Sequence, residues 1–249
     1  MGNCALQDLV MAGVRWELTE NPALCDIKKP KIQQNLFVNQ KQNNEKNIVV
    51  PAMAPVTIDT VKSMVERPTD VDSLIRMICE FNHPLRIGAT NVVVPNIATK
   101  PNGLVIITDL PSSDDDLSGK ILTGSAGEMT DKMLAAIGMS RENVSIIPLL
   151  FWRTPGGRSP IREELDLSLP FVNKIVEMLA PRVVITFGTI ATTEFAKTSL
   201  NDAHGSEIVS DAGYKIVPMF HPNYLMLKPS AKKDAWAALQ HVQNLLKNA

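Results

Sequence analysis

Cysteine is scarce in this sequence, and the cysteines form no paired motif. Cys4, Cys25 and Cys79 are the only three in 249 residues, and they lie far apart in the chain. A secreted protein stapled by disulfides needs a denser framework, so we expect a reducing, cytoplasmic environment. Long apolar runs are also missing, since none approaches the roughly 20 residues of a membrane-spanning helix. The N-terminus lacks the basic-then-apolar pattern of a secretion signal, and we therefore predict a soluble protein with no membrane partner.

An excess of charge of one sign is lacking too. The formal net charge is −1, so no overall positive field attracts nucleic acid, and any contact with DNA must come from a local basic patch. The phosphate-binding pattern GxxxxGK[ST] is absent, and Gly119 and Gly124 are loop glycines in a different context. What the chain does have is an ordinary globular balance of 45% hydrophobic and 20% charged residues. That balance permits a sizeable core.

Composition divides the chain into three regions. Residues 1–25 contain an amphipathic pattern over 5–19, which predicts a short N-terminal helix. Residues 26–70 are polar and rich in Asn and Gln. Such sequence buries too little apolar surface to stay ordered, so we expect a flexible linker. Residues 71–249 carry the apolar runs that a folded domain needs.

Strands and helices alternate in the third region. Alternation with short connections predicts an α/β fold with three layers, α/β/α, around a central, mainly parallel four-stranded sheet. In such folds ligands bind beyond the carboxyl ends of the strands. The expected strands are 104–110, 144–150, 182–188 and 214–220, and the expected helices are 71–81, 127–138, 167–180, 189–197 and 232–247.

The segment HPNYLMLKPSAKKDAW, residues 221–236, follows the last predicted strand. His221 can act as a proton donor or a cation near neutral pH, and the alternative is a structural histidine. Leu225 can wedge between bases, and Pro222 and Pro229 would stiffen the loop. Lysines in this segment can contact phosphates or simply face solvent. These lysines are Lys228, Lys232 and Lys233.

The segment TDLPSSDDDLSGKILTG, residues 108–124, joins the first strand to a helix. Asp109 falls at the strand end, where a carboxylate can orient a water molecule. The acidic triplet Asp114, Asp115 and Asp116 suits a divalent metal such as Mg²⁺. It also fits a helix N-cap or a solvated acidic turn, and we favour this second interpretation.

A third segment, LLFWRTPGGRSPIREE over residues 149–164, contains a loop rich in Pro and Gly. Arg153 and Arg158 can contact phosphate. Trp152 can stack on a ligand or pack in the core. The Ser-Pro pair at 159–160 predicts the start of a helix, whatever the function.

Together these segments resemble family 4 of the uracil-DNA glycosylases, over about Cys79 to Ala238. RTPGGRSPIREEL resembles the family's Arg-Pro-Pro-Gly-Asn-Arg-x-Pro loop, and HPNYLMLKP resembles its His-Pro-x-Tyr-Leu-x-x-x-Pro motif. GEMTDKMLAAIGMSRENV and KKDAWAAL resemble the stretches between and after the motifs, in the family order. The predicted N-terminal helix, the polar linker and Trp152 resemble the extended alphaproteobacterial branch of the family.

The resemblance implies a DNA repair enzyme that flips uracil out of the helix and cleaves its N-glycosidic bond. It implies that His221 stabilises charge on the leaving base and that Asp109 positions water and supports the sugar cation. The implied partner is uracil-containing DNA, including single-stranded DNA, and we expect a monomer. The implied uracil-pocket positions are Thr108, Leu110, Pro111, Ser112, Leu122, Pro148 and Asn223, and the implied DNA contacts are Arg153, Arg158, Tyr224, Leu225, Lys228, Lys232 and Lys233.

The pocket motifs depart from the family pattern. The family's Gly-Glu-Ala-Pro-Gly reads Thr-Asp-Leu-Pro-Ser at 108–112, so the acid is one methylene shorter and both glycines are lost. The family's stacking Phe corresponds to Leu122, and its base-reading Asn corresponds to Pro148, which has no polar side-chain group. Three hypotheses follow: an active glycosylase of altered chemistry, an inactive relative that keeps the fold and weak DNA or protein binding, and a metal-dependent nucleotide hydrolase at the acidic triplet.

Family 4 enzymes commonly hold a [4Fe–4S] cluster through four cysteines, which is more than this chain has. At the matching positions stand His83, Trp152 and Ser168, with Cys79 slightly out of register. We therefore predict no cluster and no other metal, with Trp152 filling the space by packing.

Overall fold

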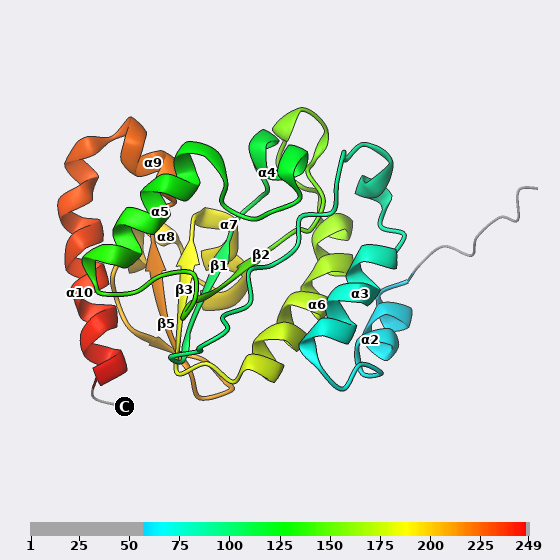
Figure 1. Ribbon diagram of the computed structural model, residues 1–249, viewed down its shortest axis with the longest axis horizontal. Helices are drawn as coiled ribbons and strands as arrows, with labels where there is room; N and C mark the ends of the chain where they lie inside the picture. The colour runs from blue at the N-terminus through cyan, green and yellow to red at the C-terminus, as the bar shows by residue number, and fades with distance from the viewer. Residues whose placement is uncertain (1–56, 248–249) are drawn as a thin grey trace, which may run out of the picture. The chain divides into compact units, whose positions relative to one another are not determined.

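The computed structural model describes residues 57–247, which Figure 1 draws as a coloured ribbon. The helix predicted over 5–19 and the predicted linker up to residue 56 lie outside the described residues. The described part is built around a five-stranded sheet with the strand order β2-β1-β3-β5-β4. Its strands are β1 (Leu104–Thr108), β2 (Ser145–Pro148), β3 (Val183–Phe187), β4 (Ile208–Val209) and β5 (Lys215–Met219).

The four strands predicted from the sequence are all present and run parallel to one another, so the α/β class and the mainly parallel sheet are confirmed. The sheet has five strands rather than four, because the two-residue β4 pairs antiparallel with β5. Two residues are too few for an apolar period to show in sequence. Side chains of the parallel strands alternate between two covered faces. In β1, Val105 and Ile107 join one core, while Leu104 and Ile106 join the other.

Helices cover both faces of the sheet, which confirms the three-layer arrangement (Figure 1). The helices are α2 (Ile58–Val65), α3 (Val71–Glu80), α4 (Ser113–Ser118), α5 (Gly124–Ala136), α6 (Arg162–Leu179), α7 (Thr189–Ala196), α8 (Leu200–Ala203), α9 (Pro222–Leu227) and α10 (Lys232–Lys247), with 3-10 turns at Pro84–Ile87, Pro155–Gly157 and Pro229–Ala231. Helices α2, α3, α6 and α7 contribute to the core on one face. Helices α5 and α10 contribute to the core on the other.

Helix α2 lies inside the range predicted to be a linker, 26–70, so the folded part begins earlier than the sequence suggested. Thr57 caps this helix by accepting the backbone N–H of Thr60 at 3.3 Å. Val61 and Val65, four residues apart, are its buried side chains. The sequence did not indicate this helix, because eight residues at the end of a long polar stretch are too few to show a clear apolar period.

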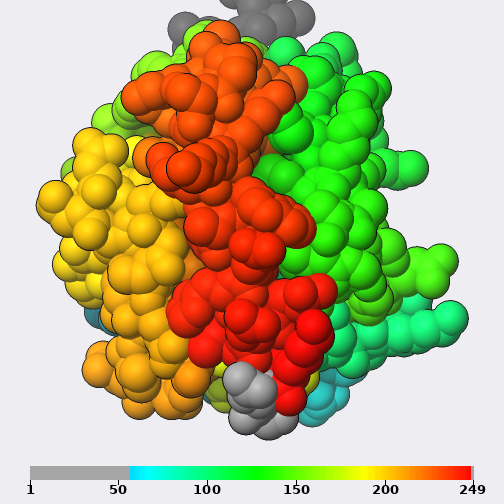
Figure 2. All heavy atoms as spheres, turned by 90° about the vertical axis from the view of Figure 1, so that its left-hand side faces the viewer, coloured from blue at the N-terminus to red at the C-terminus, as the bar shows by residue number. Residues whose placement is uncertain are grey.

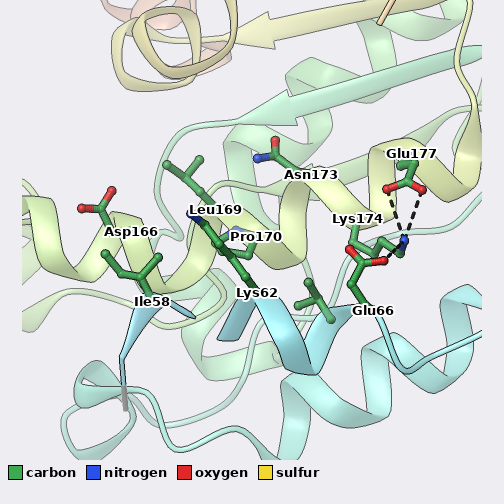
Figure 3. A pocket seen from close by; sticks show the side chains of 10 residues that line it. Ile58, Lys62, Glu66, Asp166, Leu169, Pro170, Asn173, Lys174 and Glu177 are labelled. Atoms are coloured by element: carbon green, nitrogen blue, oxygen red, sulfur yellow. Dashed lines mark hydrogen bonds and ion pairs between the residues drawn. The ribbon is translucent and has the colours of Figure 1, made fainter. Parts of the chain in front are cut away.

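A groove of about 440 Å³ separates part of α2 from α6 (Figure 3). At one end of it, Lys174 Nζ lies 2.9 Å from a carboxylate oxygen of Glu66 and 3.1 Å from one of Glu177. Figure 3 shows both carboxylates turned toward this ammonium group. Because both carboxylates are exposed, these ion pairs contribute little, and the buried valines hold α2 in place.

The carboxyl ends of the four parallel strands meet at one edge of the sheet. Thr108 ends β1 and is in register with Pro148 of β2 and Phe187 of β3. Phe187 is in register with Met219 of β5. The three segments singled out in the sequence therefore leave the sheet at this edge, where ligands of such folds bind. None of the helices in residues 57–247 combines the length and apolar character needed to cross a membrane.

Candidate active site

His221 and Thr108 face each other at the carboxyl edge of the sheet. His221 is the N-cap of α9, and its Nδ1 accepts the backbone N–H of Asn223 at 3.2 Å. Its Nε2 lies 3.1 Å from Thr108 Oγ1. Because Nδ1 is an acceptor, the neutral ring carries its proton on Nε2 and donates it to the Thr108 hydroxyl. The imidazole is thus held in one tautomer.

Burial lowers the pKa of His221 to about 4, although the Asp115 carboxylate acts in the opposite direction. The ring is therefore neutral at pH 7. Of the two roles that the sequence suggested for this histidine, the structure favours a neutral donor over a cation. A neutral N–H can still stabilise negative charge that develops on a bound ligand.

Asp109 follows β1 and turns toward the start of α7, where its Oδ1 accepts the backbone N–H of Ala191 at 2.6 Å. Gly188 leaves room for this turn, because a Cβ there would lie 2.1 Å from Asp109 Oδ2 and its φ of 101° suits glycine. Burial raises the pKa of Asp109 to about 6, while the backbone amides of α7 act in the opposite direction. A carboxylate that is mostly ionised at pH 7 therefore stands at this strand end.

Two carboxylates of the acidic triplet accept hydrogen bonds from nearby loop residues and so stabilise the loop. Asp115 forms a capping box with Ser112: its Oδ2 accepts the Ser112 N–H at 2.9 Å, and the Ser112 hydroxyl accepts the Asp115 N–H at 3.1 Å. Asp115 Oδ1 also accepts the N–H and the hydroxyl of Thr123, both at 2.7 Å. Asp116 Oδ1 accepts the N–H of Thr90 at 2.9 Å. The helix-cap interpretation is confirmed, and the described residues contain no group of three His, Cys, Asp or Glu placed to hold a metal.

Two predicted uracil-pocket residues lie in the core. Leu122 is 2% exposed and packs with residues of α5, and its carbonyl accepts the Arg141 guanidinium at 2.6 Å. Pro148 is the buried last residue of β2. Neither side chain offers a hydrogen bond or an aromatic ring to a ligand. Between the strand end and the capping box, Leu110 is half-buried and Pro111 is buried.

Helix α9 exposes some of the predicted DNA contacts and buries another. Leu225, predicted to wedge between bases, is 1% exposed and packs in the same core as Ala235 of α10. This burial argues against the predicted role, because the side chain belongs to the core of the domain. Tyr224 is exposed, and Lys228 Nζ lies 5.8 Å from the centre of its ring. Asn223, Lys232 and Lys233 are exposed as well.

Arg153 and Arg158 lie in the loop after β2 and are held differently. Arg158 forms a two-point ion pair with the buried Glu164, at 2.9 and 2.5 Å. This pairing lowers the pKa of the Glu164 carboxyl. The Arg158 guanidinium is thus committed inside the chain, which weakens its predicted role as a phosphate contact. Arg153 is half-buried, and its Nε has no hydrogen-bond partner, so it is the better candidate of the two.

Three positions match cluster ligands of the family, and their side chains, His83, Trp152 and Ser168, are fully buried and in contact with neighbouring protein groups. His83 stacks on Trp152 with ring centres 4.5 Å apart and planes 5° apart. His83 Nδ1 accepts the N–H of Leu85 at 3.1 Å, so its Nε2 donates to the Glu164 carbonyl at 3.0 Å. The Ser168 hydroxyl donates to the Leu149 carbonyl at 2.8 Å. An imidazole, an indole and a hydroxyl engaged in this way do not fit a cluster that thiolates hold.

Sequence reasoning missed two features of this site. Gly188 makes room for Asp109, and a glycine between a buried strand and a helix is the signal that could have found it. The Asp115 carboxylate accepts hydrogen bonds from both ends of its loop, from the Ser112 N–H and from the Thr123 N–H. The capping-box spacing from Ser112 was visible in the sequence, but its bond to Thr123 depends on the folded loop.

The chain resembles known proteins over most of the part described. Residues 95–240 match the Uracil DNA glycosylase superfamily. The chain is 32% identical over 148 residues to the type-4 uracil-DNA glycosylase of Thermotoga maritima, covering 57% of this chain and 76% of that protein. It is 25% identical over 174 residues to the type-4 uracil-DNA glycosylase of Archaeoglobus fulgidus, covering 66% and 87%.

A DNA polymerase of Bacillus phage SP01 is also similar, at 26% identity over 133 residues, which make up 53% of this chain and 14% of that protein. The matched family segment spans more than half of the chain and contains every strand of the sheet, together with Thr108, Asp109 and His221. The chain therefore belongs to the uracil-DNA glycosylase superfamily, and within it to family 4.

Proposed function

We propose that this protein cleaves the N-glycosidic bond of uracil in DNA, single-stranded DNA included, with His221 and Asp109 as its reactive groups. One observation carries the proposal: a neutral histidine N–H donor, His221 Nε2–H, and an ionised carboxylate, Asp109, both lie at the same edge of the sheet. Both groups are fixed by backbone amides, Asn223 for the histidine and Ala191 for the aspartate. Groups held in advance in this way need no reorganisation during the reaction.

The two groups have complementary tasks. As the bond breaks, negative charge develops on the base, and the His221 N–H stabilises it once a base oxygen replaces the Thr108 hydroxyl. Positive charge develops on the sugar, and the Asp109 carboxylate stabilises it and orients the attacking water. Asp109 does this in its ionised form, and His221 acts in its neutral form.

Selection of the base is weak in this proposal. Pro148 presents no amide to the edge of a base, and Leu122 presents no ring to its face. Rejection of a wrong base depends on buried polar groups that only the right base satisfies. We therefore expect slow excision and poor discrimination between uracil and cytosine.

A second candidate is an inactive relative that keeps the fold and binds DNA or protein weakly. One observation favours it: the Thr108 hydroxyl already takes the His221 N–H. The exposed lysines at the start of α10, Lys232 and Lys233, would contact phosphates in either case. We expect either form to act as a monomer in the cytoplasm.

We also propose that the protein folds without an iron–sulfur cluster. The His83–Trp152 stack and the Ser168 hydrogen bond support this, because they use the groups that stand at the ligand positions. Protein produced with added iron and sulfide should be colourless and contain no iron by elemental analysis. Stoichiometric iron with inorganic sulfide would refute the proposal.

The function is tested with uracil-containing oligonucleotides, single- and double-stranded, by measuring abasic sites under single-turnover conditions. We expect excision by the wild type, its loss in His221→Ala, and its retention in His241→Ala. His241 is a matched control because it is a partly exposed histidine on α10 that pairs with Glu207. No excision by the folded wild type would reject the first candidate and leave the second.

A further inference from the structure

An apolar groove of about 200 Å³ lies between α5 and α10, the green and the orange-red helices that run side by side in Figure 2. Each helix lines it with residues at positions i, i+3, i+4 and i+7, beginning at Met129 in α5 and at Lys232 in α10. This spacing places the four residues of each helix on one face. The two faces therefore turn toward each other and leave a space between them.

The groove combines buried apolar side chains with an exposed aromatic ring. Met133, Leu225 and Leu239 line it and are almost fully buried. Trp236 also lines it, and its indole is 43% exposed. The volume is below the roughly 300 Å³ of a pocket for a drug-sized ligand, so it suits one flat ring. A partner helix that binds in a groove needs a longer apolar surface for its several anchors.

Two lysines supply the charge of this groove. Lys132 and Lys232 line it and are exposed. Within residues 57–247, the lysines that form ion pairs are Lys100, Lys174 and Lys215. Both groove lysines are therefore available to bind phosphates. A site for one flat ring between two cations matches the chemistry of a nucleotide within a strand, which has an aromatic base and a phosphate on each side.

The groove begins about one helical turn from the reactive histidine. Leu225 lines the groove and follows His221, the N-cap of α9, by four residues, which is a rise of about 6 Å. Successive nucleotides of a stacked strand are about 3.4 Å apart. A strand whose uracil is bound at His221 therefore reaches the groove within a few nucleotides.

We propose that the groove between α5 and α10 binds one unpaired base of the DNA strand near the uracil, with the base stacked on Trp236 and its phosphates on Lys132 and Lys232. The base must be unpaired, because the faces of a paired base are covered by its neighbours in the duplex. Stacking on an aromatic side chain is tolerant of sequence, so this site adds affinity for single strands without reading bases. The inference rests on the proposed function for the choice of DNA as the ligand.

The first test measures binding without cleavage. The probe is a labelled single-stranded oligonucleotide whose uracil nucleotide carries a 2′-fluorine, which disfavours the sugar cation and keeps the DNA intact. By fluorescence anisotropy, we expect Trp236→Ala to weaken binding about tenfold and Trp236→Phe, which keeps a ring, by less than about threefold. Equal affinities of Trp236→Ala and wild type would overturn the proposal and leave the groove to an apolar protein segment.

A scan with abasic nucleotides then locates the bound base. Each position near the uracil is replaced in turn by a nucleotide that lacks its base. At one position the affinity of the wild type should fall about tenfold, whereas that of Trp236→Ala should stay unchanged, because its stacking partner is already gone. Losses of equal size in the two proteins at every position would overturn the proposal.

The phosphate contacts are tested through salt. Lys132→Ala should reduce the slope of log affinity against log salt concentration by about 0.7, the value for one phosphate of a single strand. Lys62→Ala is the matched control, because Lys62 is an exposed lysine on α2, which packs on the other face of the sheet. An unchanged slope for Lys132→Ala, or an equal decrease for Lys62→Ala, would overturn the assignment of a phosphate to the groove.

Excision separates this inference from the proposed function. Trp236 does not touch the reacting base in this arrangement. With cleavable single-stranded DNA, Trp236→Ala should keep the single-turnover rate at saturating protein within about twofold and raise the half-saturating protein concentration about tenfold. An unchanged half-saturating concentration would overturn the groove site and leave the glycosylase. The expected binding results without any excision would overturn the glycosylase and leave the groove site.

Discussion

The Nε2–H of His221 is directed at the hydroxyl of Thr108, 3.1 Å away, at the strand end where the family pattern has glycine. A base oxygen that takes this N–H must first displace the hydroxyl. A hydrogen bond between neutral partners is worth only about 1 kcal/mol net, so we expect this competition to slow the proposed reaction without blocking it. The effect of Thr108, which departs from the family pattern, can therefore be measured.

Removing the hydroxyl should accelerate excision. Thr108→Ala leaves the His221 N–H free for the substrate, and we expect the single-turnover rate to rise roughly fivefold. Thr130→Ala is the matched control, because Thr130 is also a buried threonine, and its hydroxyl donates to the Ala126 carbonyl within α5. A slower reaction in Thr108→Ala would show that the hydroxyl positions the imidazole instead of competing for it.

The rate should depend on pH through Asp109. This carboxyl has a pKa of about 6 and must be ionised, whereas His221, with a pKa of about 4, is already neutral at pH 6. We expect excision to increase as pH rises through about 6, with a single acid limb. Asp109→Asn should be slow and flat over this range, and Asp109→Glu should keep the limb. If the rate of Asp109→Asn still fell at low pH, the pH dependence would have to come from another group.

The same aspartate should lower stability at neutral pH. Its folded pKa is raised above the ordinary value of 3.8 for this side chain, so the folded state binds more protons than the unfolded state between about pH 4 and 6. The contribution of Asp109 to stability is therefore fully present below pH 4 and is lost as pH rises through 6. Urea unfolding should show Asp109→Asn gaining stability relative to wild type at pH 7 but not at pH 4. Equal differences at both pH values would contradict the raised pKa.

Restoring an amide at the end of β2 should restore selection of the base. Pro148→Asn gives the pocket a group that can both donate to and accept from a base edge. We expect the preference for uracil over cytosine to rise by at least about tenfold. Pro148→Ala separates the effect of the amide from the loss of the proline ring and should leave the preference unchanged. Equal preferences in the two variants would place residue 148 away from the bound base.

The sequence was sufficient for the four parallel strands of the sheet and for the polar residues at their ends, but not for β4. Buried parallel strands are continuous apolar runs, so β1, β2, β3 and β5 were visible, and polar residues at their ends could be placed at one edge. Exposure within α9 was not visible, because a six-residue helix is too short for a reliable apolar period. Nothing in the sequence therefore argued against an exposed Leu225, whereas the fold turns this side chain inward and leaves Leu227 exposed.

The space that a metal cluster occupies in related enzymes should here be held by aromatic packing. Trp152 is fully buried against His83, so Trp152→Ala should cost about 3–5 kcal/mol of unfolding free energy. Trp236→Ala is the matched control: this indole is 43% exposed, and its loss should cost less than about 1 kcal/mol. Urea unfolding monitored by circular dichroism measures both. Equal losses of unfolding free energy in the two variants would contradict a stabilising role for the His83–Trp152 stack. The expected difference would show that the fold depends on this stack, because the matched positions offer no thiolate that could hold a cluster in its place.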